Sequence, residues 1–518
     1  MARTRFAPSP TGYLHIGGVR TALFCWLFAR KHGGQFILRI DDTDAQRNVE
    51  AALAPILHGL KWMGINWDEG AEIDGPHGPY YQSKKLERYQ EAAKTLLDKG
   101  LAYHDYATTD EIKVERETAE KEKRVFLYSR NWMADTPEKR KKFEAEGRAG
   151  VVRLKIPREG FCEFNDHIRG AMKVAWESEQ DHVIQRADGT CLYHLASVVD
   201  DFDMKITHVI RAEEHLSNTP RQIFIARGLD YPLPEYAHVP FVAEPGSKNK
   251  LSKRKIDKYL KNADFKKIYE HGHAIAQKIG LTTSAETFNP VIVDFFEQVG
   301  YLPEAVVNYL VLLGWSLDDK TEFFTRAEMI RHFSLERVNK AAASFDTAKL
   351  MAFQEKYMRE LPVDRKVELA LPFVEKAKFV TALDEAARAK VRAIIEAAGD
   401  RIRVAGDILD YDDFFIVADQ LVYDDKAFEK RIKKPPEAVG LLKKFRGQLA
   451  SATAFDAAAL DKLLNDWVAA EGIQVGQIIH ALRVAVTGKA VGFGLFETLA
   501  ILGKEACLAR IDRALART

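Results

Sequence analysis

The sequence predicts an α/β fold with a parallel sheet, followed by a region made of helices only. Residues 3–40 read as strand, turn, helix and strand within about forty residues, the pattern of a parallel unit with a right-handed crossover. Beyond about residue 330, helical patterns continue to the end and no strand-rich half is evident. At 518 residues the chain is too long for one core, so we expect two to four domains.

The first predicted strand begins at Arg3 and leads into a turn that contains Pro8, Pro10 and Gly12. Two prolines and a glycine make such a turn rigid and sharply defined. Ligands of parallel sheets bind at the carboxyl ends of the strands. The turn lies at one such end and is therefore a candidate binding site.

The predicted helix after this turn begins near His15, Gly17 and Gly18. The two glycines have no Cβ, so a ligand can approach the backbone closely. A helix N-terminus offers free N–H groups and a partial positive charge to a phosphate, and His15 adds a polar ring. On its own, His-x-Gly-Gly most often belongs to an ordinary strand–turn–helix.

Four apolar residues recur at helical spacing after the glycines: Val19, Leu23, Phe24 and Leu27. The sequence Lys31-His32-Gly33-Gly34 is typical of a helix end. The compact apolar run 35–40 then predicts a buried strand.

Three carboxylates, Asp41, Asp42 and Asp44, follow this second strand. A cluster of acids at a strand end is either a solvated turn or part of a site. Because ligands of parallel sheets bind at this end, both interpretations stay open on the residues alone.

Further elements are expected along the chain. Helices are predicted at 50–63 and 83–99, each closed by a glycine, and at 109–124. Short strands are predicted near 151–156, 172–176 and 206–210. The sequence around Ser217 and Pro220 predicts a capped helix start, and Asp456 is a candidate N-cap of a later helix.

The composition limits the class of protein. Hydrophobic residues are 47% and charged residues 29%, and the net charge is +1, so a nucleic-acid surface has to be a local basic patch. The four cysteines form no Cys-x-x-Cys pair, which argues against a disulfide framework and a cysteine-based zinc site. Without a signal-type apolar core or a membrane-spanning apolar run, we expect a cytoplasmic protein with no membrane partner.

Two motifs resemble those of a known family. Residues 5–18, Arg-Phe-Ala-Pro-Ser-Pro-Thr-Gly-Tyr-Leu-His-Ile-Gly-Gly, resemble the first signature of class I aminoacyl-tRNA synthetases in its glutamyl-tRNA synthetase form. Residues 250–253, Lys-Leu-Ser-Lys, have the order of the second signature. A lysine-rich loop alone is most often a solvated surface, but the presence of both motifs at this separation argues against chance agreement.

The resemblance implies a split doubly wound (Rossmann-type) sheet. The expected domains are a first catalytic half at 1–100, an inserted acceptor-end-binding domain at 101–190 and a second catalytic half with the lysine loop at 191–254. An insertion with a tRNA stem-contact region follows at 255–330, and an all-helical anticodon-binding domain at 331–518. The β-barrel anticodon region of glutaminyl enzymes is disfavoured.

The activity implied is attachment of L-glutamate to tRNA(Glu) in two steps, through a glutamyl-adenylate made from ATP, with Mg²⁺ on the ATP phosphates. Lysine ammonium groups would meet the charge that develops on the attacked phosphate. The residues implied in catalysis are His15, Lys250, Ser252 and Lys253. Those implied in ATP binding are the same four with Gly17 and Gly18. Those implied in glutamate binding are Arg5, Ala7, Ser9, Asp41, Tyr193 and Arg211.

The chain departs from the family pattern at several positions. Asp41 stands where Glu is usual, so the reach toward the substrate's ammonium group changes. His194 replaces Asn, and Ala212 replaces Gly. Many relatives have a zinc-binding cysteine cluster where this chain has His-Asp-Tyr-Ala at 104–107. Because tetrahedral zinc needs four suitable ligands, we expect no zinc and no other protein-bound metal.

Some alternatives stay open. The lysine-rich segment 256–290 is either a solvated helical excursion or an added RNA contact. A small nucleotidyltransferase lacks the lysine loop, a truncated relative that modifies a tRNA base lacks the C-terminal helices, and an inactive RNA-binding module would not need both signatures. We expect a monomer, and both strict charging of tRNA(Glu) and additional charging of tRNA(Gln) fit the sequence.

Overall fold

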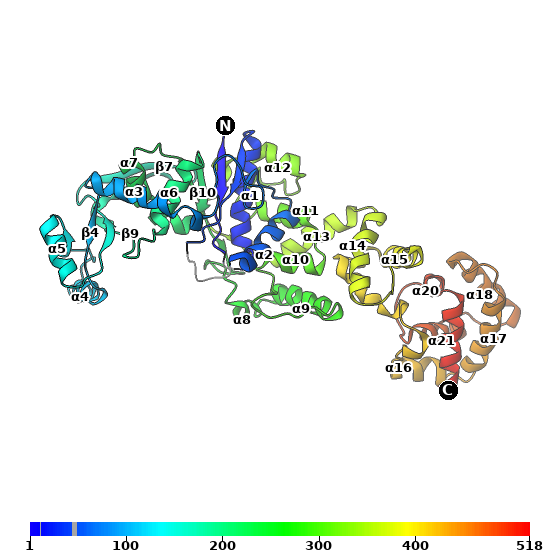
Figure 1. Ribbon diagram of the computed structural model, residues 1–518. Coiled ribbons are helices and arrows are strands. Elements are labelled where there is room, and N and C mark those ends of the chain that lie inside the picture. The colour runs from blue at the N-terminus through cyan, green and yellow to red at the C-terminus, as the bar shows by residue number, and fades with distance from the viewer. Residues whose placement is uncertain (11, 44–48) are drawn as a thin grey trace. The chain divides into compact units, whose positions relative to one another are not determined.

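The computed structural model describes residues 1–10, 12–43 and 49–518 (Figure 1). Asp44 of the predicted acidic cluster lies outside these residues. The chain forms two compact units. The first contains residues 1–266, 285–297 and 303–350, and the second contains residues 267–284, 298–302 and 351–518.

The first half of the catalytic sheet is parallel, as predicted. Strand β1 (Arg3–Phe6) pairs with β2 (Gln35–Leu38), which pairs with β3 (Glu69–Gly70). Helix α1 (Ile16–Lys31) connects β1 to β2 and is buried along most of its length, including all four predicted apolar positions. Arg30 and Lys31 form the basic last turn, and the helix ends before Gly33.

The second half of the sheet lies beside the first. Strand β10 (His208–Ala212) pairs in parallel with β11 (Glu235–Val239). Next to β10, the N–H of Thr207 donates to the carbonyl of Arg3 across 3.0 Å. One long stretch of chain, which contains the inserted segment, separates β1 from β10, so the predicted split sheet is confirmed.

Two helices flank β10: α6 (Tyr193–Asp203) and α7 (Thr219–Gly228). Pro220 lies at the start of α7 as predicted. The predicted side-chain cap is wrong: residues Glu213–Asn218 form a 3₁₀ helix that runs directly into α7, and no side chain caps its start.

The segment inserted between the halves divides between two sheets. Four short strands form an antiparallel sheet in the order β5-β4-β6-β9: β4 (Ala102–Asp105), β5 (Met133–Ala134), β6 (Val151–Leu154) and β9 (Val183–Gln185). Helices α4 (Thr109–Lys121) and α5 (Pro137–Ala145) accompany it. The hairpin β7 (Phe161–Asp166) and β8 (Gly170–Ala175) instead extends the sheet of β10 and β11.

The remaining elements of the first unit pack around the sheet. Strands β12 (Val242–Ala243) and β13 (Ala343–Ser344) pair in parallel. The helices are α2 (Val49–Trp62), α3 (Leu86–Asp98), α8 (Ile256–Tyr259), α11 (Pro303–Val311) and α12 (Arg326–His332). Helices α9 (Ala263–Lys278), α10 (Val293–Val299) and α13 (Thr347–Glu360) have residues in both units.

The second unit is all-helical in its described residues, as the predicted fold class requires. Residues 331–350, which we expected in this helical region, belong instead to the first unit and contain β13. The helices of the second unit are α14 (Val363–Lys376), α15 (Glu385–Ala398), α16 (Asp425–Phe428), α17 (Ala438–Ser451), α18 (Ala457–Glu471), α19 (Gly476–Thr487), α20 (Leu495–Leu502) and α21 (Lys504–Ala516). The predicted cap of α18 is confirmed, because the Asp456 carboxylate accepts the Ala459 N–H across 3.0 Å. Gly472 ends that helix in the left-handed conformation, which glycine adopts without strain.

The lysine-rich segment is helical, in α8 and α9. Phe265, Ile268 and Ile275 are buried, so one face of α9 packs against the protein. Lys266 and Lys267 are exposed, and Lys278 pairs with Asp410. In the part of the chain that the structure describes, we find no helix with the length and apolar character needed to span a bilayer.

Candidate active site

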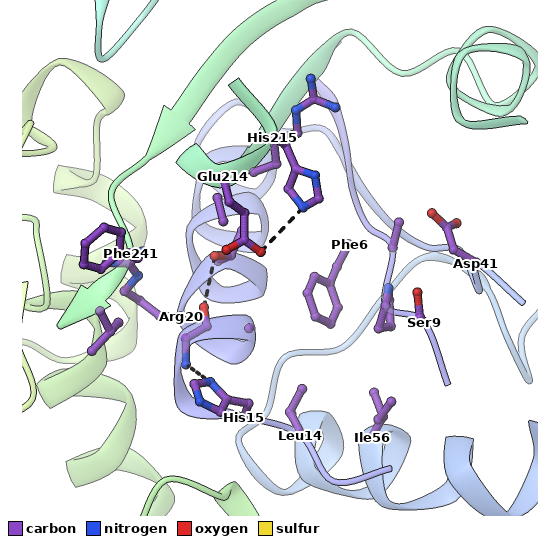
Figure 2. A pocket seen from close by; sticks show the side chains of 18 of the residues that line it. Phe6, Ser9, Leu14, His15, Arg20, Asp41, Ile56, Glu214, His215 and Phe241 are labelled. Atoms are coloured by element: carbon purple, nitrogen blue, oxygen red, sulfur yellow. Dashed lines mark hydrogen bonds and ion pairs between the residues drawn. The ribbon is translucent and has the colours of Figure 1, made fainter. Parts of the chain in front are cut away.

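A cavity of about 540 Å³ opens at the carboxyl ends of β1, β2 and β10 (Figure 2). It brings together ten of the twelve predicted site residues, from four separate parts of the chain: Arg5, Ala7, Ser9, His15, Gly17, Gly18, Asp41, Tyr193, Arg211 and Lys250. Ser252 and Lys253 follow directly in the chain but do not line it. In Figure 2, Ser9 and Asp41 lie on one side of the cavity, His15 at its lower end and Glu214 and His215 at its upper end.

His15 caps the helix that forms one wall. Its Nδ1 accepts the N–H of Gly17 across 2.9 Å, so a proton on the neutral ring sits on Nε2. Burial, with the positive charges of Lys250 and Lys253, lowers the pKa of His15 to about 4. At neutral pH the ring is therefore an uncharged donor beside a helix N-terminus, an arrangement suited to an anionic oxygen.

Arg211 is a buried cation held by neutral groups. Its side chain donates to His238 Nε2 at 3.0 Å, Gln222 Oε1 at 2.7 Å and Thr219 Oγ1 at 2.9 Å. No carboxylate contacts it among the described residues, and burial lowers its pKa. Because a guanidinium has five N–H groups, two remain for a ligand, one on each terminal nitrogen.

The orientation of Arg211 is relayed from the neighbouring strand. His238 on β11 contacts Asp166 through Nδ1 at 2.6 Å, which leaves its Nε2 as the acceptor for Arg211. Burial lowers the pKa of His238, so its ring is neutral and accepts as this geometry requires. The fixed ring thus directs the free edge of the guanidinium toward the cavity.

A second group of charges surrounds Arg39, which is 1% exposed. Its Nε lies 2.7 Å from Asp41 Oδ1, and its Nη1 lies 2.6 Å from Asp201 Oδ1. Arg5 also donates to Asp201 twice, from Nε across 3.0 Å and from Nη2 across 3.4 Å. Three of the five N–H groups of Arg5 thus remain available to a ligand.

Asp41 is the carboxylate of this group that lines the cavity. Its pKa is raised to about 6, because burial and the nearby charge of Asp200 outweigh the attraction of Arg39. It is mostly ionised at neutral pH and can pair with a substrate cation.

The lysine loop follows β12 and is fixed at its base. The hydroxyl of Tyr259 accepts the N–H of Ser252 across 2.9 Å, and buried Glu244 pairs with Lys255 and Lys258. Lys250, at the cavity, pairs with Glu214. The exposed ion pair is weak, so an anionic ligand can take over the ammonium group.

Sequence reasoning missed several lining residues. Glu214 and His215 follow Arg211 closely in the chain, and that proximity is the signal that could have identified them. Burial lowers the pKa of His215 to about 4. Arg20, on α1, is buried and donates to the carbonyls of Leu313 and Pro240. In the sequence, only its position one turn after Gly17 indicated that it could line the cavity.

A second cavity, of about 550 Å³, lies in the inserted segment and shares Tyr193 with the first. Aromatic residues Phe126 and Tyr128 and basic residues Arg116 and Arg153 line it. His194, the departure from the family pattern, also lines it. Burial lowers the pKa of His194 to about 3, so it is neutral.

At the position of the relatives' cysteine cluster, Asp105 is already engaged. It accepts from Tyr128 at 2.6 Å and from Arg153 at 3.0 Å. The Asp105 carboxylate therefore forms a buried ion pair with Arg153. The expected absence of zinc at this position stays a prediction.

The cavity as a whole has two chemically different ends. Arg5, Arg211 and Asp41 can hold carboxylates and an ammonium group, because a guanidinium binds carboxylates bidentately. His15, the N-terminus of α1 and Lys250 offer hydrogen bonds and positive charge to phosphates. Such a site can bring a carboxylate and a phosphate ester together.

Comparisons with known proteins agree with this chemistry. The family described as "tRNA synthetases class I (E and Q), catalytic domain" matches residues 1–289 and 286–352. The family described as "Anticodon binding domain" matches residues 365–515.

Individual relatives match over almost the whole chain. A glutamate–tRNA ligase of Moorella thermoacetica is 42% identical over 513 residues, which cover 99% of this chain and 97% of that protein. One of Desulforudis audaxviator is 40% identical, with 99% and 96% covered. The crystal structure of a glutamate–tRNA ligase from Elizabethkingia meningosepticum, in complex with its amino acid, has a TM-score of 0.82 at 32% identity, with 99% of both chains covered.

Proposed function

The chain belongs to the family of class I tRNA synthetases for glutamate and glutamine, and from this premise we propose that it is a glutamate–tRNA ligase. It attaches L-glutamate to tRNA(Glu) in two steps. The glutamate carboxylate first attacks the α-phosphate of ATP, which gives glutamyl-adenylate and pyrophosphate. The 3′-terminal ribose hydroxyl of the tRNA then takes the glutamyl group.

One observation carries the proposal: the cavity combines a buried, uncompensated guanidinium with a phosphate-binding helix start. Arg211 is 6% exposed and has only neutral partners among the described residues. A buried charge without a counter-ion costs stability, so its retention is explained by a ligand that supplies the carboxylate. Arg5 receives the second carboxylate of glutamate, and Asp41 receives its ammonium group.

The glutamate site is completed by smaller contacts. Ser9 and Tyr193 supply hydroxyls, and Ala7 supplies close-packed backbone beside the substrate. These residues hold the substrate's carboxylate in line for attack. As in other phosphoryl transfers, positioning and charge neutralisation are the main contributions of the protein, and no covalent nucleophile is needed.

The phosphate end binds ATP. His15 donates from Nε2 to a phosphate oxygen, while Gly17 and Gly18 admit the nucleotide close to the start of α1. Lys250 leaves Glu214 for the phosphates, and Ser252 and Lys253 close over them with the loop. Their charges stabilise the transition state more than the ground state. Mg²⁺ accompanies the ATP phosphates.

The transfer step uses the inserted segment. Its cavity offers aromatic rings for stacking of a base and arginines for phosphates, and it meets the catalytic cavity at Tyr193. We place the 3′ end of the tRNA there. The helices after about residue 331 bind the anticodon, residues 255–330 contact the stem, and the enzyme acts as a cytoplasmic monomer.

The proposal is tested by ATP–pyrophosphate exchange on the full chain. We expect exchange that depends on L-glutamate and is strongly stimulated by tRNA(Glu), as the family generally requires bound tRNA for activation. Glutamine and aspartate serve as matched controls and should give only background exchange. Exchange with another amino acid in place of glutamate would contradict the proposal.

A further inference from the structure

Three potential metal ligands meet at the edge of the sheet away from the catalytic cavity. His208 and Glu235 are the first residues of β10 and β11 and are direct partners in the parallel ladder. His167 lies in the turn between β7 and β8, and its N–H donates to Tyr236 on β11 across 2.8 Å. Arg211, the candidate glutamate-binding residue, lies three residues further along β10 than His208, about 10 Å away at the strand rise.

The Glu235 carboxylate lies between the two imidazoles. Its Oε2 is 2.5 Å from His167 Nε2, and its Oε1 is 3.6 Å from His208 Nε2. One ligand atom from each residue can be chosen so that all lie within 4.8 Å of one another. Ligands at about 2.0–2.2 Å around a tetrahedral ion are about 3.4 Å apart, so small side-chain rotations suffice to close the site.

The ring of His208 is already oriented. Its Nδ1 lies 2.8 Å from Thr207 Oγ1, and the same hydroxyl lies 3.2 Å from the carbonyl oxygen of Arg3. If Thr207 donates to that carbonyl and accepts from Nδ1–H and from the Arg3 N–H, which lies 2.8 Å away, every partner is satisfied. The Nε2 lone pair then faces Glu235. Metal-binding histidines usually have such an outer hydrogen bond, which fixes the tautomer and the ring. Phe28 supports the ring face, with centroids 4.6 Å apart.

We propose that His167, His208 and Glu235 form a binding site for one divalent transition-metal ion of the Zn²⁺, Co²⁺ or Ni²⁺ class. Two imidazoles and a carboxylate suit these ions and not the oxygen-preferring Mg²⁺ and Ca²⁺. The Glu235 side chain is 59% exposed, which leaves room for water as a fourth ligand. A bound ion ties the β7–β8 turn to the start of β10 and β11.

The proposed site goes against the sequence-based expectation of no protein-bound metal. It is separate from the cysteine-cluster position of the relatives and from the Mg²⁺ that accompanies ATP. The ion is a structural clamp, because one ligand comes from the β7–β8 turn of the inserted segment and two come from strands of the second catalytic half. The site therefore affects the stability of the first unit without touching the substrates.

The test uses the full chain, stripped with a chelator and titrated with Zn²⁺ and Co²⁺ by calorimetry and visible absorption. We expect one saturable equivalent and a rise in Tm with Zn²⁺. His208→Ala, His167→Asn and Glu235→Gln should each remove both, whereas His480→Ala, an exposed histidine of α19 in the second unit, should retain both. ATP–pyrophosphate exchange by His167→Asn shows that this variant is folded.

Thr207 separates an oriented site from a chance cluster of ligands. Thr207→Val should weaken Zn²⁺ binding about 10- to 100-fold, the usual effect of losing an outer hydrogen bond. Thr207→Ser keeps the hydroxyl and should bind as the parent does. The proposal is overturned if the parent protein shows no saturable equivalent, or if the equivalent persists in the folded His167→Asn and Glu235→Gln variants.

Discussion

Replacing Arg211 with alanine should raise the KM for glutamate by a factor of about 10² to 10⁴. Two N–H groups of its guanidinium are free of protein partners, and each hydrogen bond to a charged group contributes about 1.5 to 3 kcal/mol. Losing both costs about 3 to 6 kcal/mol, and each 1.4 kcal/mol corresponds to about tenfold in binding. The KM of Arg211→Lys should lie between those of the parent and of Arg211→Ala, since an ammonium group cannot form the bidentate pair.

The assay is tRNA-dependent ATP–pyrophosphate exchange over a range of glutamate concentrations. Arg227→Ala is the matched control, because Arg227 is an exposed arginine on α7 and should leave the KM unchanged. Thermal melting shows that the variants are folded. A folded Arg211→Ala enzyme with a KM within about twofold of the parent would refute the assignment of a carboxylate to this guanidinium.

Three further predictions follow from the same site. Lys253→Ala should slow adenylate formation about 10²- to 10³-fold with little change in glutamate affinity. Single-turnover rates of this variant and of the control Lys261→Ala check this prediction. Equal rates in the two variants would exclude Lys253 from the transition state. Because Asp41 has a raised pKa of about 6, it loses its charge as the pH falls, so the glutamate KM should rise about fourfold from pH 7.5 to 5.5. Asp41→Asn should remove this pH dependence, and an unchanged profile in that variant would reject Asp41 as the ammonium partner. A fragment of residues 1–350 should melt at a higher temperature than one of residues 1–330, because the shorter one loses β13, its pairing with β12 and the hydrogen bond of Ser344 to Glu244; equal melting would show that β13 does not support the lysine loop.

Much of the catalytic fold could be predicted because its signals are local. The apolar spacing of α1, its basic last turn and the run in β2 are each read within a few residues. The same holds for Asp456, whose carboxylate caps a helix only three residues away.

The parts that sequence reasoning missed depend on distant pairing. The β7–β8 hairpin joins the sheet of β11 through one pair of residues, Tyr236 and Asp166, and no local pattern separates it from the other inserted strands. The capping expectation for α7 was wrong because the preceding 3₁₀ helix continues directly into it.

The candidate site shows the same division. The signature residues were found from their motifs, but the electrostatic setting was not. Asp201 pairs with Arg5, which lies 196 residues earlier in the chain, and with Arg39, which lies 162 residues earlier. The Lys250–Glu214 pair spans 36 residues. Such partners become visible only when the sheet halves are assembled.

Charging of purified tRNA tests whether this chain esterifies tRNA(Glu) with glutamate. The full enzyme is incubated with ATP, Mg²⁺, labelled L-glutamate and either tRNA(Glu) or tRNA(Gln), and acid-precipitable label is measured. We expect ATP-dependent label on tRNA(Glu) that is lost on mild alkaline hydrolysis of the ester; label on tRNA(Gln) distinguishes the broader from the stricter enzyme. No label on tRNA(Glu), with exchange-competent enzyme and intact tRNA, would show that the chain is not a glutamate–tRNA ligase.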